Sequence, residues 1–243
     1  MGSKIESGHA VNVSNFFKLI QKCDNLTGWN PSNDSLKIAE MTTFHTDSQT
    51  LLNAFNTAVM AAKTPIADNT ALFDPLSKLV TRIVNYYDST NAKEQSKKNA
   101  RSLANDLRGF NAKKPKGTAP DAEWVSSSHQ SFVQKANKFK EIIEFLNADG
   151  LYKPNETELK IAELTTLWTN LDSSIKDLAT VMAPLDQAKA SLYRKIYAKE
   201  NGLITIALLA KRYAKALKGA QAIEIKEIMA IVFRRISSKL IVY

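Results

Sequence analysis

Evenly spaced cations are the residues of this sequence that could most readily do chemistry. Those at 93, 97 and 101 lie four residues apart, and those at 211, 215 and 218 are similarly spaced, so each set would share one face of a helix. A face of this kind binds phosphate backbones without reading base sequence. The candidate contacts for nucleic acid or another anionic partner are Lys93, Lys97, Arg101, Lys113, Lys114, Lys116, Lys211, Arg212, Lys215, Lys218, Arg234 and Arg235.

The positive charge is concentrated in two stretches of the chain. The net charge is +9, with 33 Lys and Arg against 24 Asp and Glu. Residues 186–243 hold 12 basic and 4 acidic residues, and residues 89–117 hold 8 and 2, so the rest of the chain is slightly acidic. We expect the two basic stretches to form one surface if they occupy equivalent places in the fold. The alternative is a solvated face that keeps the protein soluble.

Catalytic and metal-binding motifs are missing from the sequence. It has no glycine-rich phosphate loop, no Gly-x-Ser-x-Gly elbow and no His-Glu-x-x-His helix. Only one of its three histidines, His9, follows an acidic residue, Glu6, by three positions, whereas a di-iron bundle needs two such pairs on facing helices; a single cysteine, Cys23, excludes a cysteine-based metal site. We therefore predict no catalytic residue, no metal site, no cofactor and no enzyme activity. A weaker hypothesis is a small-ligand pocket at His45 and Ser48.

An internal duplication organises the chain. The segment LKIAEMTTF at 36–44 matches LKIAELTTL at 159–167 in seven of nine positions, at an offset of 123. The same offset pairs Trp29 with Tyr152 and aligns the apolar residues of 16–23 with those of 139–146. Fixed self-similarity of this kind indicates a repeated structural unit. We expect an N-terminal extended or disordered segment at 1–12, repeat 1 at 13–110, a Lys/Pro/Ser-rich linker at 111–128 and repeat 2 at 129–243.

Each copy should contain four helices, because apolar residues recur at helical spacing between short turns. In the second copy the apolar residues from 164 to 196 alternate at intervals of four and three, which predicts a long helix packed against a nearly aligned neighbour. Pro65 and Pro184 fall inside the long helices and should kink them. The fourth helices should be 92–108 and 220–236. The predicted fold is all-α: two tandem pseudo-repeated four-helix bundles, each with one long kinked helix, in an elongated molecule.

Several short motifs resemble an uncharacterised family of tandem-duplicated, all-helical Bacteroidota proteins. They include YKPNETELK at 152–160, LVTRIVN at 79–85 and the closing Phe233-Arg234-Arg235. The resemblance spans both copies and implies an all-helical duplicated fold. It implies no activity and no site residues.

The leading hypothesis for function is a non-catalytic structural or protein-interaction module that self-associates through long helical faces. The alternative is a sequence-nonspecific nucleic-acid-binding protein that uses basic stripes on helices three and four of each repeat. No stretch is apolar enough for a membrane span or a secretion signal, so we expect a cytoplasmic protein with a protein partner and no membrane or small-molecule partner.

Overall fold

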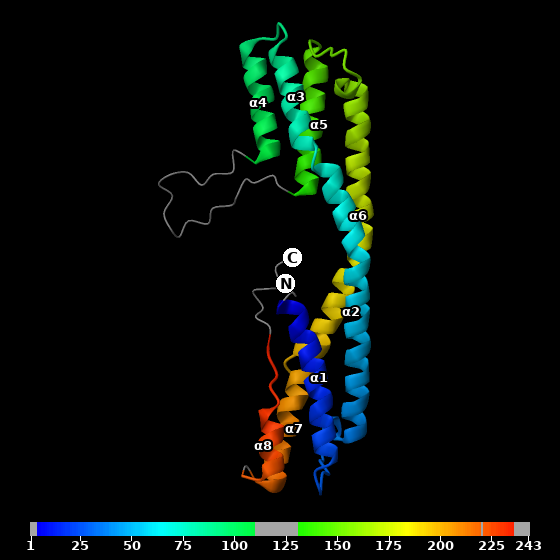
Figure 1. Cartoon of the computed structure of the whole chain (residues 1–243), viewed down its shortest axis with the longest axis vertical. Coiled ribbons are helices and arrows are strands. Elements are labelled where there is room, and N and C mark those ends of the chain that lie inside the picture. Colours follow the sequence, from blue (N-terminus) through cyan, green and yellow to red (C-terminus); the bar gives the residue numbers. More distant parts are fainter. Residues whose placement is uncertain (1–3, 110–130, 220, 236–243) are drawn as a thin grey trace, which may run out of the picture. The chain divides into compact units, whose positions relative to one another are not determined.

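The computed structural model describes residues 4–109, 131–219 and 221–235, and every regular element within them is a helix (Figure 1). This confirms the all-α class. The predicted linker at 111–128 lies outside the described residues. The elements are α1 (Lys4–Asp24), η1 (Asp34–Leu36), α2 (Ile38–Phe73), α3 (Leu76–Asp88), α4 (Glu94–Arg108), α5 (Phe132–Asp149), η2 (Thr157–Leu159), α6 (Ile161–Tyr197), α7 (Leu203–Lys218) and α8 (Ile223–Ala230).

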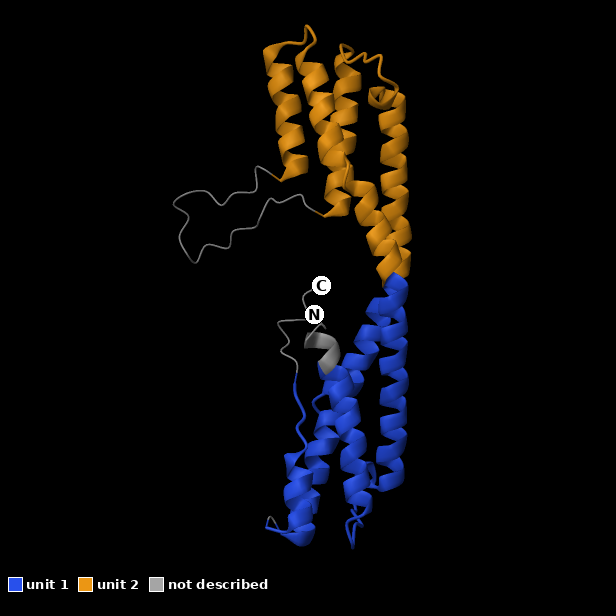
Figure 2. Cartoon of the chain, viewed as in Figure 1, with its two compact units in different colours: residues 1–62, 183–243 blue, residues 63–182 orange. Residues whose placement is uncertain are grey.

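The two compact units do not follow the predicted boundaries at 13–110 and 129–243. Unit 1 comprises residues 1–62 and 183–243, and unit 2 comprises residues 63–182 (Figure 2). The division falls inside both long helices, which remain helical through Pro65 and Pro184. Each unit therefore combines helices from both sequence copies.

The physical reason lies in the helix lengths. A helix of 36 residues such as α2 is about 54 Å long, whereas the 21 residues of α1 cover about 32 Å and the 13 of α3 about 20 Å. Each short helix can thus cover only one end of the long helix of its own copy. A single helix pair cannot enclose a core, so each end is completed by helices of the other copy.

The core of unit 1 is built by the start of α2, the end of α6, and α1, α7 and α8. Phe16 and Leu19 of α1 are fully buried among Leu192, Ile196 and Ala207 from the second copy. In the core, α7 contacts both α1 and α8. The core of unit 2 is built in the same way: Ile83 of α3 and Leu107 of α4 are buried with residues of α5 and α6.

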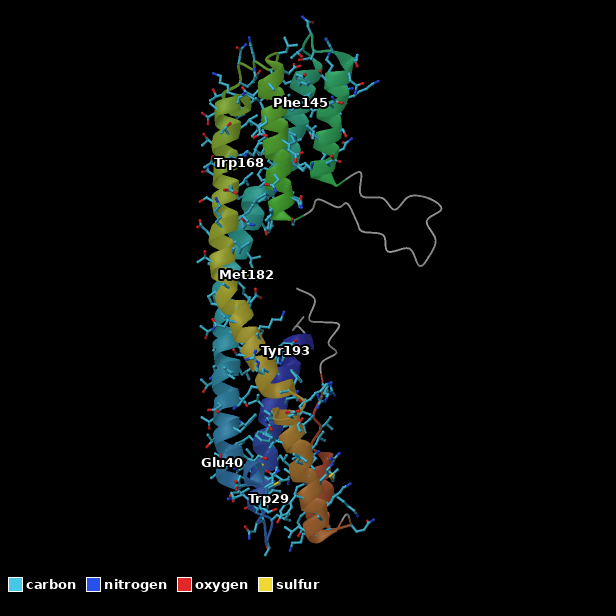
Figure 3. The ribbon with its side chains drawn as sticks, turned by 180° about the vertical axis from the view of Figure 1, so that it is seen from behind. Trp29, Glu40, Phe145, Trp168, Met182 and Tyr193 are labelled. Carbon is cyan, nitrogen blue, oxygen red and sulfur yellow. The ribbon has the colours of Figure 1, made fainter. Side chains whose placement is uncertain are left out.

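The turns before the two long helices have matching contacts. Trp29 donates its indole N–H to the carbonyl oxygen of Leu36 at 3.1 Å, and the hydroxyl of Tyr152 donates to that of Leu159 at 3.0 Å. Trp29 meets the ring of Tyr213 edge-on at 4.9 Å, and Tyr152 meets that of Tyr86 at 5.2 Å. Residues 123 positions apart thus fix each long helix in the same local geometry. Figure 3 labels Trp29 beside this turn of unit 1.

Two expectations about the chain ends are wrong. The segment expected to be extended or disordered at 1–12 is helical from Lys4, and His9 and Asn12 in it are fully buried. The last helix, expected at 220–236, ends at Ala230 and is followed by an extended stretch, residues 231–235. This stretch is rich in β-branched and aromatic residues, which favour extended backbone. Side chains of α1 and α7 bind several of its main-chain polar groups, as described next.

Candidate functional site

The predicted cations of unit 2 lie along α4, and two of them have acidic partners. Lys93 is the exposed residue that precedes the helix. The Lys97 ammonium lies 3.9 Å from a carboxylate oxygen of Glu94, and the Arg101 Nε donates to Asp88 at 2.9 Å. These pairs neutralise much of the charge expected for a phosphate-binding stripe.

The predicted cations of unit 1 differ in exposure. Lys211 is buried, with 7% of its surface exposed, whereas Arg212, Lys215 and Lys218 on the same helix are exposed. Lys211 therefore does not belong to the outer stripe. Arg234 and Arg235 are exposed on the extended stretch after α8. None of the five exposed cations has a carboxylate within 4 Å in the part of the chain that the structure describes.

The basic residues of the two copies fall in different units, so a common basic surface stays a prediction. Lys113, Lys114 and Lys116 lie outside the described residues.

The extended stretch, residues 231–235, is held along α1 by two asparagines. Asn12 donates from Nδ2 to the carbonyl oxygen of Arg234 at 2.8 Å and accepts from the N–H of Arg234 at 3.0 Å. One turn further, Asn15 donates to the carbonyl oxygen of Val232 at 2.8 Å. Because residues i and i+3 share a helix face, α1 presents its amides to alternate residues of the stretch. We call this stretch, residues 231–235, the C-terminal strand for its extended backbone; it pairs with no other strand within the described part of the chain.

Lys211 holds the beginning of the C-terminal strand from the other side. Its ammonium donates to the carbonyl oxygens of Met229, at 3.2 Å, and of Ile231. It also lies 5.4 Å from the centre of the Phe233 ring. Burial lowers the pKa of Lys211 because it removes water from the ammonium group. The two carbonyl oxygens and the aromatic ring replace part of that water. The sequence interpretation of Lys211 as a nucleic-acid contact is wrong, because its donors are used inside unit 1.

A buried polar cluster supports Asn12. The Tyr197 hydroxyl accepts from Asn12 at 3.4 Å and lies 3.1 Å from Nδ1 of His9. His9 is enclosed by the rings of Phe55, Tyr193 and Tyr197, and its Nε2 has no partner. Burial lowers the pKa of His9 to about 4, so the ring is neutral at pH 7 and we assign the hydroxyl as the donor to Nδ1. Tyr193 is labelled on α6 in Figure 3.

The outer edge of the C-terminal strand has free main-chain groups. The N–H and C=O of Phe233 form no hydrogen bond within the described part of the chain, while its neighbours 232 and 234 bind α1. Val232 is 57% exposed. An extended segment alternates the direction of its main-chain groups, so the edge at Phe233 faces away from the asparagines. It has the chemistry of a sheet edge without a partner strand.

Of the other residues singled out in the sequence, Ser48 and Cys23 are buried and His45 is half-buried. Ser48 is buried and donates to the carbonyl oxygen of Phe44 at 2.7 Å, and His45 stacks against Phe17 at 5.1 Å. Cys23 is fully buried, and burial raises the pKa of its thiol to about 12. His45 and Ser48 therefore have local structural partners of their own.

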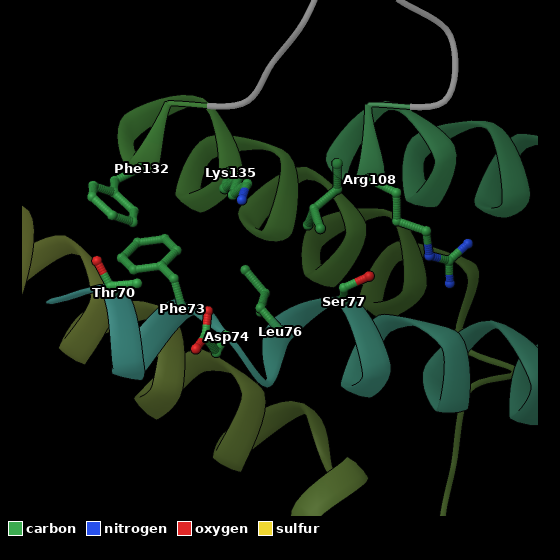
Figure 4. Close-up of a pocket in the computed structure, with 9 residues that line it drawn as sticks. Thr70, Phe73, Asp74, Leu76, Ser77, Arg108, Phe132 and Lys135 are labelled. Carbon is green, nitrogen blue, oxygen red and sulfur yellow. The ribbon is translucent and has the colours of Figure 1, made fainter. Parts of the chain in front are cut away.

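A pocket of about 400 Å³ lies in unit 2, where α2 passes into α3 and where α4 ends and α5 begins (Figure 4). Buried Phe73, Leu76 and Leu107 line its inner part. Arg108 and Lys135 lie on the α4 and α5 side. The sequence interpretation overlooked both cations, because neither belongs to a regularly spaced set.

No model of a known protein family matches the chain, and neither curated proteins nor solved structures show significant similarity to it. Its resemblance to a Bacteroidota family stays a prediction. None of the helices in the described residues is long and apolar enough to cross a membrane. Within the same residues, no three His, Cys, Asp or Glu side chains gather closely enough to hold a metal ion.

Proposed function

We propose that this protein is a non-catalytic helical interaction module, and that unit 1 self-associates through the C-terminal strand. The observation that carries the proposal is the edge at Phe233, whose N–H and C=O form no hydrogen bond with the described residues. Asn12 and Asn15 fix one side of the C-terminal strand and Lys211 binds the carbonyl oxygen of its first residue, so its main chain is already ordered before a partner arrives. Preordering reduces the entropy cost of adding a strand to an edge.

The long helices are less suited to this role than the sequence suggested. The exposed apolar residues of α2 are Met60, Ile66 and Leu72, each six positions from the next. Six residues turn a helix by about 240°, so these side chains point in different directions and form no stripe.

A second copy of this chain fits the edge by symmetry. Two C-terminal strands that pair antiparallel about Phe233 would each offer one N–H and one C=O to the other, as a two-fold interface requires. In this register Val232 of each copy lies opposite Arg234 of the other. The exposed arginines then face aliphatic side chains, and like charges are not placed directly opposite each other.

Cysteine cross-linking tests this register. Residues 232 and 234 would form non-hydrogen-bonded pairs across the interface, with Cα atoms about 4.5 Å apart, which suits a disulfide. The double variant Val232→Cys/Arg234→Cys should oxidise to a covalent dimer at micromolar concentration. Each single variant is the matched control and should cross-link at least tenfold more slowly, because equal residues lie diagonally.

The native chain should in addition show concentration-dependent dimerisation in sedimentation velocity, weakened by Val232→Lys. Ile223→Lys is the control, because Ile223 is an exposed residue of α8, and it should leave dimerisation unchanged. A chain that stays monomeric at about 100 μM, or equal cross-linking of all three cysteine variants, would refute the proposal.

Nucleic-acid binding is a second candidate, favoured by the unpaired cations of unit 1. Arg212, Lys215 and Lys218 are exposed without an acidic partner among the described residues, whereas the stripe of α4 is largely paired. Changing these three residues to Gln should abolish any shift of a fluorescent DNA at low salt. The triple Gln variant at Lys93, Lys97 and Arg101 is the matched control and should bind normally. Binding that is insensitive to salt, or equally reduced in both triple variants, would count against this candidate.

A further inference from the structure

We propose that the pocket of unit 2 is a binding site for a small organic anion with a flat aromatic or apolar body, such as an aryl carboxylate. This inference goes beyond the proposed interaction function and rests on another unit of the molecule. Its basis is the combination in one pocket of unpaired cations, an apolar floor and a pair of aromatic rings.

The cations of the pocket have no acidic partner in the described part of the chain. Neither Arg108 nor Lys135 has a carboxylate within 4 Å among the described residues, whereas Arg82, Arg101 and Lys138 of the same unit each have one. The guanidinium of Arg108 donates to the hydroxyl of Thr81 at 2.6 Å and to the side-chain oxygen of Asn105 at 3.5 Å. These neutral acceptors fix its position and leave N–H donors for a ligand. Burial lowers the pKa of Arg108, which indicates a partly dehydrated cation.

The apolar part of the pocket is formed by two aromatic rings and two leucines. Phe73 and Phe132 lie with ring centres 4.8 Å apart and planes inclined at 46°. Phe73 is buried, with 4% of its surface exposed, and Leu76 and Leu107 extend the same apolar floor. Figure 4 shows these rings on one side of Lys135 and Arg108 on the other. A ligand could therefore place a ring near the phenylalanines and a carboxylate near the cations.

Two further features set the charge of the ligand. Asp74 is the single carboxylate in the lining, against two cations, so the lining as a whole favours one negative charge. The pocket also includes Leu76 and Ser77 of the first turn of α3, and the residue before that helix provides no side-chain cap. The first-turn N–H groups add positive potential on the same side. At about 400 Å³, the pocket has room for a bicyclic ligand.

The experiment compares two probes that differ in one charge, 2-naphthoate and its neutral amide 2-naphthamide, by calorimetric titration of the full chain. We expect naphthoate to bind with a submillimolar Kd and the amide at least tenfold more weakly. Inorganic phosphate should bind more weakly than naphthoate, because it lacks the ring. This comparison uses the unaltered protein and does not depend on a variant that folds.

Variants then locate the site. Arg108→Met and Lys135→Met should each weaken naphthoate binding at least fivefold and leave amide binding unchanged, whereas Phe132→Leu should weaken both. Arg82→Met is the matched control, because Arg82 lies on unit 2 outside this pocket and is paired with Glu158 at 2.8 Å. Equal binding of naphthoate and amide, phosphate binding as tight as naphthoate, or naphthoate binding that survives Arg108→Met in a folded protein would overturn the proposal. No binding at millimolar naphthoate would do so as well.

Discussion

The amide of Asn12 forms two hydrogen bonds with the main chain of Arg234, one as donor at 2.8 Å and one as acceptor at 3.0 Å. One side chain thus replaces the neighbouring strand that an extended segment would otherwise need. The contact joins residues 222 positions apart and ties the C-terminal strand to the first helix. It positions the edge on which the proposed self-association depends.

Asn12→Ala should destabilise unit 1 and release the C-terminal strand. Both hydrogen bonds are lost and the Tyr197 hydroxyl loses a donor, so we expect a loss of about 2 kcal/mol in the free energy of unfolding. Urea unfolding measures the loss, and hydrogen exchange should speed up at the amide of Arg234. Asn15→Ala removes a single bond and should cost less than about 1 kcal/mol. Equal costs for the two variants would contradict the central role of Asn12.

Stability should fall on mild acidification because of His9. The pKa of His9 is about 4 in the folded protein, below its ordinary value of 6.5, so the unfolded chain binds the proton more readily. The contribution is fully present above pH 6.5 and is lost as the pH falls towards 4, by up to about 3 kcal/mol. Urea midpoints between pH 7 and pH 4 measure this effect. The His9→Leu variant should have a flatter profile over this range, and an unchanged slope in that variant would assign the effect elsewhere.

Cys23 should be unreactive in the native protein. Its thiol is fully buried and its pKa is raised to about 12, so at pH 8 the thiolate fraction is about a thousandfold below that of a thiol with the ordinary pKa. Labelling with a disulfide reagent should therefore proceed only through opening of unit 1, and it should be fast in denaturant. Asn12→Ala should accelerate labelling if it destabilises that unit. Rapid labelling of the native chain would contradict the observed burial.

Tyr152→Phe should cost about 1 kcal/mol of unfolding free energy, because the buried carbonyl oxygen of Leu159 loses its donor. Tyr86→Phe is the matched control: its ring contacts Tyr152, but its hydroxyl forms no hydrogen bond within the described residues. Urea unfolding should show a loss for the first variant and little change for the second. A larger loss for Tyr86→Phe would mean that ring packing outweighs the hydrogen bond.

The helices themselves could be predicted from the sequence, because helix ends depend on local signals. The stop after α5 coincides with Gly150, which has a φ of 70°, and the stop after α1 is followed by Gly28 at 86°. Left-handed backbone of this kind favours glycine and ends a helix. The long helices also follow directly from their apolar spacing.

The grouping of helices into units could not be predicted in the same way. The two copies carry nearly the same apolar pattern, so α1 could match the helices of either copy equally well. Which helices form a unit depends on the helix lengths and on the core that helices of both copies build together. The apolar spacing within one helix carries no information on either. The end of α8 could not be predicted for the same reason. Ile231 and Val232 suit either a helix face or an extended strand. The residues that bind the extended stretch, Asn12 and Asn15, lie more than 200 positions away in the sequence.

The candidate site was predicted only in part. Regular spacing identified the face of α7, but Lys211 is buried on it, because a lysine has a long apolar stem and can cover core surface. Arg108 and Lys135 are near each other only because α4 contacts α5 in the folded unit. They lie 27 positions apart on different helices, so no helical spacing in the sequence indicates a shared pocket.

The division of the chain also sets an order of events on the ribosome. Unit 2 is one continuous segment, so all of its core residues have been synthesised once residue 182 is made. Unit 1 begins first and is completed last: Phe16 and Leu19 must wait for Leu192 and Ile196, which are translated more than 170 codons later. During that interval the apolar face of α1 has its partners on α2 but lacks those on α6 and α7. A nascent chain stalled between these points should therefore bind holdase chaperones through its first helix, while its middle segment is already protected.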